Sequence, residues 1–153
     1  MWENLLNFIL MRSRRAGKAA QKFIQVLESE GAEEFLEVLL KLMGLVLRLD
    51  KDFRRNIGNF NGRYLFRSQD RRITVAAVFK DDRLKVSEDE IGDTHMTVVF
   101  RNAKALMSFL LSPKPDILGS MLRQDVTIDG NLNYLYKFAY MAKHLQLKVT
   151  GAL

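Results

Sequence analysis

Hydrophobic and polar residues divide the chain into a helical first part and a second part in which strands alternate with helices. Residues 1–57 contain no proline, and apolar residues recur there at helical spacing. Between residues 63 and 100 the period shortens to two, which is typical of half-buried strands. Helical spacing returns after Asn102 and again after Asn131. This order predicts an α+β domain with helices gathered on one face of a sheet.

The first part contains two predicted helices, separated by a break at Gly31 within the segment SEGAEE. The second helix, from about Ala32 to Arg55, is apolar at nearly every position outside one polar stripe. An ordinary surface helix has an apolar arc of somewhat over about 100°, so this helix must be covered on two sides. A central place in the core, a subunit interface and a lipid phase would each provide that cover. The polar stripe has members three and four residues apart: Glu34, Glu37, Lys41, Gly44 and Arg48.

Four segments predict strands. The segment RYLFRSQD, which starts at Arg63, gives the first, and QDVTIDGN, which starts at Gln124, gives the last. Between them, RRITVAAVFKDDRLKVSED predicts a hairpin whose turn is Asp81–Asp82. The segment THMTVVFRN predicts another strand. Apolar residues of the hairpin and of this strand alternate on one face: Ile73, Val75, Ala77, Phe79, Leu84, Val86, Met96, Val98 and Phe100.

Helix boundaries in the second part follow from capping residues and prolines. Asn102 is a plausible cap for a helix that Pro113 and Pro115 end, and Ser112 or Asp116 then caps a short helix. Gly130 ends the last strand. Asn131 opens the final helix, which runs from Leu132 to about Gln146.

The final helix has two apolar stripes rather than one. The first consists of Leu132, Leu135, Tyr136, Ala139 and Ala142, and the second of Tyr134, Phe138, Met141 and Leu145. The helix after Asn102 is also apolar on a broad arc, and both helices contain methionine, whose flexible side chain suits an irregular apolar cavity. Periodicity alone allows either a filled core or such a cavity.

Composition removes several classes of chemistry. The chain of 153 residues has a net charge of +6, two histidines and no cysteine, so disulfides, thiolate metal sites and a cysteine nucleophile are excluded. His95 and His144 stand alone, which favours structural or solvent-facing roles over a metal site. No glycine-rich phosphate loop or catalytic serine motif occurs. We therefore expect no enzyme activity, no cofactor and no metal, and the charge gives no argument for nucleic acid.

The N-terminal residues do not resemble an export signal. In MWENLLNFILMRSRRAG the apolar run precedes the basic cluster, which is the reverse of a secretory signal. No stretch has the ~20 largely apolar residues that cross a bilayer. We expect a cytoplasmic protein, and leave peripheral contact with a membrane open.

The segment from Phe79 to Leu145 contains four parts in order: a hairpin with the turn KDDRLKV, the strand THMTVVF leading into the helix NAKALMSFLLS, the segment PKPDILGSML, and the unit QDVTIDGNLNYLYKF. In the type and order of these parts it resembles the sterol carrier protein 2 type of lipid-binding domain. The resemblance covers about Asn61 to Leu147. The preceding helices are similar in layout to those of bacterial accessory factors of ubiquinone biosynthesis that carry this domain. The C-terminal TGAL differs from the peroxisomal tripeptide of eukaryotic members.

The resemblance implies a mixed, mainly antiparallel sheet of about five strands and an apolar tunnel between sheet and helices. It implies non-enzymatic binding and carrying, or presentation, of a fatty acyl, sterol-like or isoprenoid lipid. The residues expected to line the tunnel are Phe100, Leu106, Met107, Leu110, Leu118, Met121, Leu122, Tyr134, Phe138 and Met141.

The predicted organisation is an N-terminal helical segment, residues 1–57, followed by the lipid-binding domain, residues 58–153, in one compact unit. The alternative function is a scaffold with a solid core that assembles through its apolar N-terminal helices, for example as a homodimer. The ligand identity, the pathway and the partner proteins do not follow from the sequence.

Overall fold

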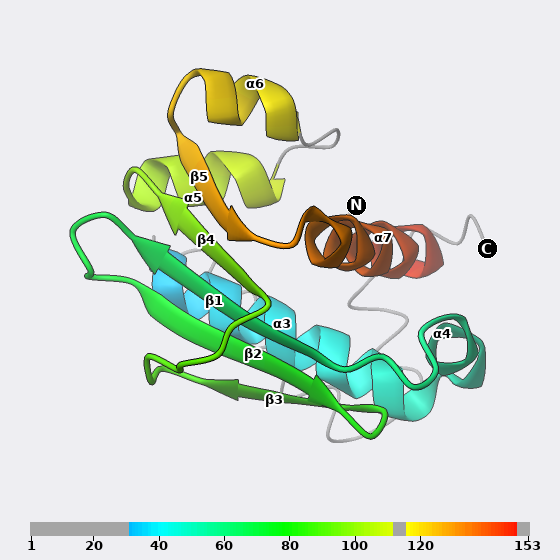
Figure 1. Cartoon of the computed structure of the whole chain (residues 1–153). Helices are drawn as coiled ribbons and strands as arrows, with labels where there is room; N and C mark the ends of the chain where they lie inside the picture. Colours follow the sequence, from blue (N-terminus) through cyan, green and yellow to red (C-terminus); the bar gives the residue numbers. More distant parts are fainter. Residues whose placement is uncertain (1–30, 112–115, 150–153) are drawn as a thin grey trace.

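The alternating segments form a five-stranded sheet in the computed structural model, which describes residues 31–111 and 116–149 (Figure 1). The helices predicted within residues 1–30 lie outside this part. The strands are β1 (Gly62–Ser68), β2 (Thr74–Lys80), β3 (Arg83–Ser87), β4 (Met96–Phe100) and β5 (Val126–Gly130). The helices are α3 (Ala32–Leu49), α4 (Lys51–Asn56), α5 (Ala103–Leu111), α6 (Ile117–Leu122) and α7 (Leu132–Val149).

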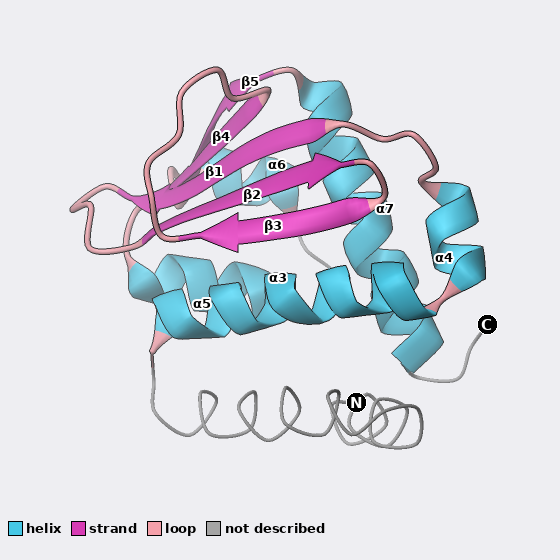
Figure 2. Cartoon of the chain, turned by 90° about the horizontal axis from the view of Figure 1, so that it is seen from below, coloured by secondary structure: helices cyan, strands magenta, loops and turns pink. Residues whose placement is uncertain are grey.

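β1 lies at the centre of the sheet, whose strand order is β3-β2-β1-β4-β5. It pairs antiparallel with β2 and parallel with β4, whereas the β2–β3 and β4–β5 pairs are antiparallel. Figure 2 shows α3, α5 and α7 on one face of the sheet. The predicted α+β class, with a mixed and mainly antiparallel five-stranded sheet, is therefore confirmed.

The β2–β3 hairpin closes through the predicted two-residue turn. Lys80 pairs with Arg83, and Asp81 and Asp82 between them have φ values of 52° and 57°. Two successive residues with positive φ form the turn that matches the right-handed twist of a hairpin. Aspartate tolerates this conformation better than most residues, so the local sequence is enough to set the register of this pair.

The sheet face towards the helices carries the predicted alternating residues. Buried there are Ile73, Val75, Ala77, Phe79, Met96, Val98 and Phe100, together with Tyr64 and Phe66 of β1. The period of two thus predicted the buried face correctly, because successive side chains of a strand point to opposite faces.

The opposite face of the sheet is partly covered by residues 88–95. The strand pairings make β3 and β4 parallel, so the connection between them has to cross the sheet, and it passes on the face away from the helices (Figure 1). Arg67 Nη1 lies 3.1 Å from Glu90 Oε1, and Arg63 Nη2 donates to the Gly92 carbonyl at 3.1 Å. Leu65, on this face, is consequently buried.

α3 is a central helix of the core. It contacts β2 and β3 on one side and α5 and α7 on another. The backbone of α3 faces β3 at Gly44, where an added Cβ would be in van der Waals contact with the Cβ of Leu84 at 3.4 Å. Glu34, Lys41 and Arg48 of the polar stripe are exposed. The central-core interpretation is confirmed by the side chains that are at most 2% exposed: Leu36, Leu40, Leu42, Met43, Val46 and Leu47.

The prediction of one helix from Ala32 to Arg55 is wrong, because α3 and α4 are separated by Asp50. This residue has an extended backbone, with φ −104° and ψ 109°. Its carboxylate accepts hydrogen bonds from the amides of Asp52 and Phe53 at 2.9 and 3.1 Å. An aspartate that caps a new helix in this way competes with continuation of the preceding one. Apolar periodicity hides the break, since Phe53 and Ile57 are buried beyond it.

Three of the predicted caps are confirmed. The side chains of Asn102, Asp116 and Asn131 each accept a hydrogen bond of 2.8–2.9 Å from an amide two or three residues later. Residues 112–115, which include both prolines and Ser112, lie outside the described residues. α7 continues to Val149, three residues beyond its predicted end.

In the described part of the chain, no helix is both long and apolar enough to cross a bilayer. α3 and α4 share one core with the sheet. Residues 31–57 therefore do not form a core separate from that of the sheet. For residues 1–30 the predicted division at residue 57 stays a prediction.

The junction of β5 and α7 requires glycine at position 130. Gly130 has φ +124°, and a Cβ at this position would lie 2.3 Å from the carbonyl oxygen of His95. That same carbonyl accepts a hydrogen bond from the Asn131 amide at 3.0 Å. A side chain would therefore both strain the backbone and push β5 away from the start of β4.

We predict that Gly130→Ala lowers the free energy of unfolding by about 2–4 kcal/mol, measured by urea denaturation. Gly92→Ala is the matched control, because nothing lies within 4 Å of a Cβ built there. Equal stability of the two variants would contradict the assigned strain at Gly130.

Candidate functional site

Large apolar side chains that remain exposed gather on two helices, α6 and α7. Among the described residues, seven large hydrophobic side chains are exposed, and six of them belong to these helices. Figure 1 shows α6 alongside β5, and α7 follows β5 in the chain. We call this set the α6–α7 surface; its residues are Leu118, Met121, Leu122, Leu132, Tyr136 and Tyr140.

α6 has the reverse of the usual arrangement of a surface helix. Ser120 is 8% exposed, whereas Leu118 and Leu122 are 68% and 77% exposed. The helix is nevertheless well defined, because Asp116 caps it and the Ser120 amide donates to the Asp116 carbonyl at 2.9 Å. Single exposed apolar residues are common, but several on one short helix mark a surface that binds something.

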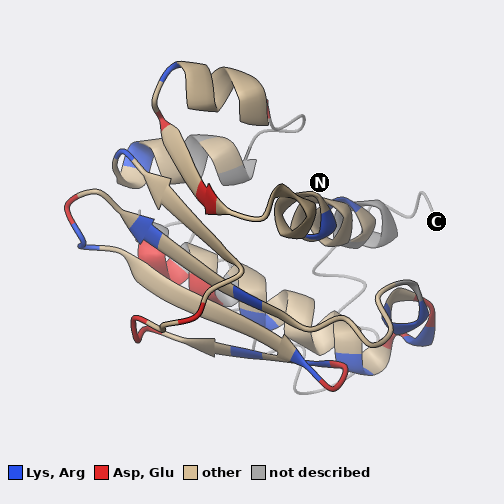
Figure 3. Cartoon of the chain, viewed as in Figure 1, with Lys and Arg blue, Asp and Glu red and all other residues tan. Residues whose placement is uncertain are grey.

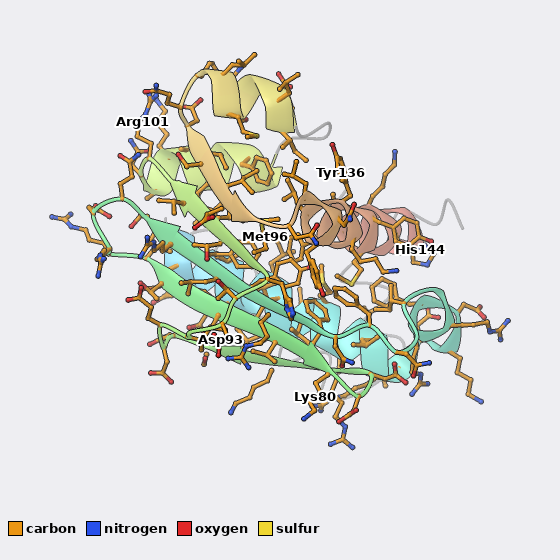
Figure 4. The ribbon with its side chains drawn as sticks, in the orientation of Figure 1. Lys80, Asp93, Met96, Arg101, Tyr136 and His144 are labelled. Carbon is orange, nitrogen blue, oxygen red and sulfur yellow. The ribbon has the colours of Figure 1, made fainter. Side chains whose placement is uncertain are left out.

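α7 is apolar on two faces. Its outer face presents Leu132, Tyr136 and Tyr140, which stand four residues apart. Figure 4 shows Tyr136 pointing away from the sheet, while Met96 lies in the interior. The inner face is buried and consists of Leu135, Phe138 and Met141.

The predicted grouping of the α7 residues into stripes is wrong in one respect. Leu135 was placed with Leu132 and Tyr136, but it is 5% exposed while they are 50% and 65% exposed. Leu135 projects 60° from Leu132 around the helix axis, on the side away from Tyr136, at about 100° per residue. The face of α7 that points to the core therefore lies on the same side of Leu132 as Leu135, and Tyr136 lies on the opposite side.

An aromatic cluster fixes which face of α7 points inward. The ring of Tyr64 lies 5.4 Å from the ring of Phe138 and 5.7 Å from that of Phe79. The Tyr64 hydroxyl donates to the main-chain carbonyl of Tyr134 at 2.7 Å. Burial raises the pKa of the Tyr64 phenol well above its usual range, and the neighbouring Tyr134 adds to the effect. β1 is thereby tied to the first turn of α7.

The two histidines take part in ring contacts. His95 Nδ1 accepts a hydrogen bond from the Arg63 amide at 3.0 Å, and its ring stacks on Tyr134 with centroids 4.4 Å apart. The ring of His144 lies 5.3 Å from that of Phe53. These contacts fit the structural roles expected for both. Within residues 31–111 and 116–149, no group of three potential metal ligands comes together.

A pair of carboxyl groups lies at the far side of the sheet from β5. A hydrogen bond with Glu37 and the negative charge of Glu37 raise the pKa of Glu88. Lys41 Nζ lies 2.9 Å from Glu37 Oε2. Glu88 is exposed, and paired catalytic carboxylates require a sheltered site, so this pair gives no argument for acid–base catalysis.

The structure divides the ten residues predicted to line a tunnel into groups. Four are buried together in the core: Phe100, Leu106, Phe138 and Met141. Tyr134 is half-buried against that core. Three lie on the surface: Leu118, Met121 and Leu122. The side chains of Met107 and Leu110, on α5, lie outside the described ones. The lining of a tunnel by these residues stays a prediction.

Three residues of the α6–α7 surface were not among the predicted lining residues: Leu132, Tyr136 and Tyr140. Their spacing of four was visible in the sequence as a helical stripe. Spacing could not distinguish an outward stripe from an inward one, so it provided no reason to select these three residues.

The chain is similar to known proteins in its three-dimensional structure, whereas no similarity was found at the level of sequence. No protein-family model and no curated protein sequence matches the chain. The UbiJ-SCP2 ubiquinone synthesis protein is 17% identical with a TM-score of 0.52, over 80% of this chain and 98% of that protein. The sterol carrier protein domain 2 of Helicoverpa armigera is 14% identical with a TM-score of 0.50, over 69% of this chain and 84% of that domain.

The chain has the fold of a sterol carrier protein 2 domain. The resemblance noted in the sequence is thus confirmed at the level of the fold. The same fold also matches part of a larger enzyme, the sec-alkylsulfatase Pisa1 from Pseudomonas sp., at 16% identity and a TM-score of 0.53. That match covers 67% of this chain and 15% of the sulfatase, so the chain spans a small fraction of the enzyme's length. The sterol carrier fold therefore occurs both as a separate domain and as part of a larger protein.

The tyrosine that links β1 to α7 gives a pH-dependent prediction. At pH 7 we expect Tyr64→Phe to lower the free energy of unfolding by about 1 kcal/mol, because the Tyr134 carbonyl loses a donor. The folded state raises the phenol pKa, so the stability due to neutral Tyr64 is lost as the pH rises above about 10, the value in an unfolded chain. The difference between wild type and variant should therefore shrink above this pH.

Urea denaturation across a pH series measures the effect, with Tyr140→Phe as the control because that side chain is 49% exposed. A stability difference for Tyr64→Phe that stayed constant from neutral to strongly alkaline pH would disprove the assigned pKa shift.

Proposed function

We propose that the protein binds and carries a hydrophobic lipid and catalyses no reaction. The observation that carries the proposal is the α6–α7 surface, which lies beside an apolar core on a sterol carrier fold. Fully burying one leucine-sized side chain is worth roughly 1.5–3 kcal/mol, so leaving six large apolar side chains exposed forgoes a substantial stabilisation. An apolar ligand that covers them would recover part of it.

The buried and exposed groups of predicted lining residues suggest how a lipid would be held. Phe100, Leu106, Phe138 and Met141 are part of the core behind the site, and the exposed side chains of α6 and α7 would contact the lipid directly. Each CH₂ group of a lipid chain that these side chains cover would be removed from water, at ~0.8 kcal/mol per group. A tunnel that leads from this surface towards the core stays the expectation drawn from the sequence.

The ligand class in this proposal is a fatty acyl, sterol-like or isoprenoid lipid. Its support is the naming of two proteins with the same fold, one as a ubiquinone synthesis protein and the other as a sterol carrier. The proposed location is the cytoplasm.

The alternative, a scaffold assembled through the N-terminal helices, has less support from the described residues. Among the described side chains of α3, most apolar ones are buried within this chain, and Leu49 is the large one that is exposed. Residues 1–30, on which a homodimer through this part would also depend, lie outside the described residues.

The proposal is tested by native mass spectrometry of the purified protein and by uptake of a fluorescent fatty acid and a fluorescent isoprenoid. We expect co-purifying lipid in the wild type. The double variant Leu118→Gln/Leu122→Gln should bind at least about tenfold more weakly, which corresponds to roughly 1.4 kcal/mol. Both residues are exposed, so the fold should survive the change.

Leu49→Gln is the matched control, since it removes an exposed leucine from α3 and should leave uptake unchanged. Wild-type protein that neither co-purifies with lipid nor takes up either probe would refute lipid binding.

A further inference from the structure

We propose that the α6–α7 surface docks on the surface of a membrane that contains anionic lipids. The inference deepens the proposed function, because it assigns to the proposed carrier a place of contact with the membrane that supplies or receives its ligand. It rests on the exposure of apolar side chains and on the charges that accompany them.

The outer stripe of α7 ends in a basic residue. Leu132, Tyr136 and Tyr140 follow one another at intervals of four, and Lys143 lies on the same stripe, seven residues after Tyr136. Lys143 is exposed. Tyrosine prefers the interface between headgroups and hydrocarbon, where its ring is in an apolar environment and its hydroxyl is hydrated. Lysine can extend its aliphatic stem along such a surface and place its charge at the headgroups.

Acidic residues are missing from the helix that carries most of this stripe. From Leu132 to Val149 the sequence contains lysines and no aspartate or glutamate. Lys137 is half-buried beside the stripe, and its ammonium lies over the ring of Phe60, 5.7 Å from the centroid. In Figure 3 the described part of the α7 ribbon has positions coloured as Lys or Arg and none coloured as Asp or Glu, whereas acidic positions lie mainly in the loops of the sheet and at the start of α3.

The acidic residues next to α6 are largely compensated by arginine. Asp125 lies 3.1 Å from Arg123 Nε and 3.2 Å from Arg101 Nη1, and Asp116 lies 3.9 Å from Arg123 Nη1. Asp129 of β5 is the remaining acidic residue between α6 and α7, and it is exposed. The charge around the apolar side chains is therefore not predominantly negative, so anionic headgroups can approach.

A second copy of this chain fits the surface less well than a membrane does. A two-fold symmetric contact through α7 would bring together two helices that carry lysines and no acidic residue, so no opposite charge on the partner helix would compensate them. A membrane with anionic lipids instead offers an apolar layer for the leucines and tyrosines and negative headgroups for the lysines. Contact through one face each of α6 and α7 is binding to the interface and not insertion across the bilayer.

The test uses full-length protein and sedimentation with vesicles of phosphatidylcholine alone or mixed with phosphatidylserine. We expect binding to the mixed vesicles that weakens as salt is added. Lys143→Glu should weaken it by roughly tenfold, because the substitution reverses a charge that contributes at the membrane surface. Tyr136→Ser/Tyr140→Ser should weaken binding to a similar or greater extent through loss of apolar contact. Lys51→Glu, at an exposed position on α4, makes the same change in net charge and should have an effect within about twofold.

Uptake of a water-dispersed fluorescent fatty acid separates this proposal from the proposed function. Lys143→Glu should keep fatty acid uptake while losing vesicle binding, and urea denaturation of each variant verifies that it is folded. Absence of fatty acid uptake in wild-type protein that still binds vesicles would refute the carrier function and leave the docking surface standing.

Three outcomes would overturn the docking surface: wild-type protein that does not bind mixed vesicles at low salt, equal losses for Lys143→Glu and Lys51→Glu, or a wild-type dimer that Tyr136→Ser/Tyr140→Ser dissociates. The second would show that net charge alone drives binding. The third would show that the surface joins two copies of the chain.

Discussion

The burial of α3 against the sheet is the constraint on which the rest of the structure depends. One face of this sheet is lined with large apolar side chains, which helices must cover to remove them from water. α3 and α7 provide most of that cover. α3 is buried around most of its circumference, and its backbone faces β3 at Gly44. With α3 in that position, α5 and α7 pack beside it on the same face, towards the β5 edge. The position of α3 against β3 and β2 therefore determines where α5 and α7 can pack.

The consequence for function lies at the opposite edge. α7 reaches the core with one face, held there by the bond between the Tyr64 hydroxyl and the Tyr134 carbonyl, and its other apolar face has no covering element among the described residues. α6 sits over β5 with its small polar residue inside and its leucines outside. Both features place most of the exposed large apolar side chains of the described residues on α6 and α7. Such concentration is the usual mark of a surface that meets an apolar partner.

Lipid carriage and membrane docking are consistent uses of this region. A carrier has to take its ligand from one membrane and release it at another, so its opening should lie where the protein meets the bilayer. Side chains that cover the ligand and side chains that touch the headgroups would then lie on the same two helices, α6 and α7, which carry the exposed Leu122 and Tyr136. The lysines of α7 supply attraction over a longer range than the apolar contacts do.

The sequence by itself determined the elements that depend on neighbouring residues: the Asp81–Asp82 turn, the caps at Asn102, Asp116 and Asn131, and the alternating face of β2 and β4. It also indicated the family through the order of these elements. Only the tertiary structure decided the parallel pairing of β1 with β4, the break at Asp50 and the inward face of α7. The physical reason is that periodicity records which residues are apolar, while burial depends on which neighbour covers them. Leu135 and Tyr136 are adjacent and both apolar in character, yet the position of the sheet places one in the core and the other in solvent.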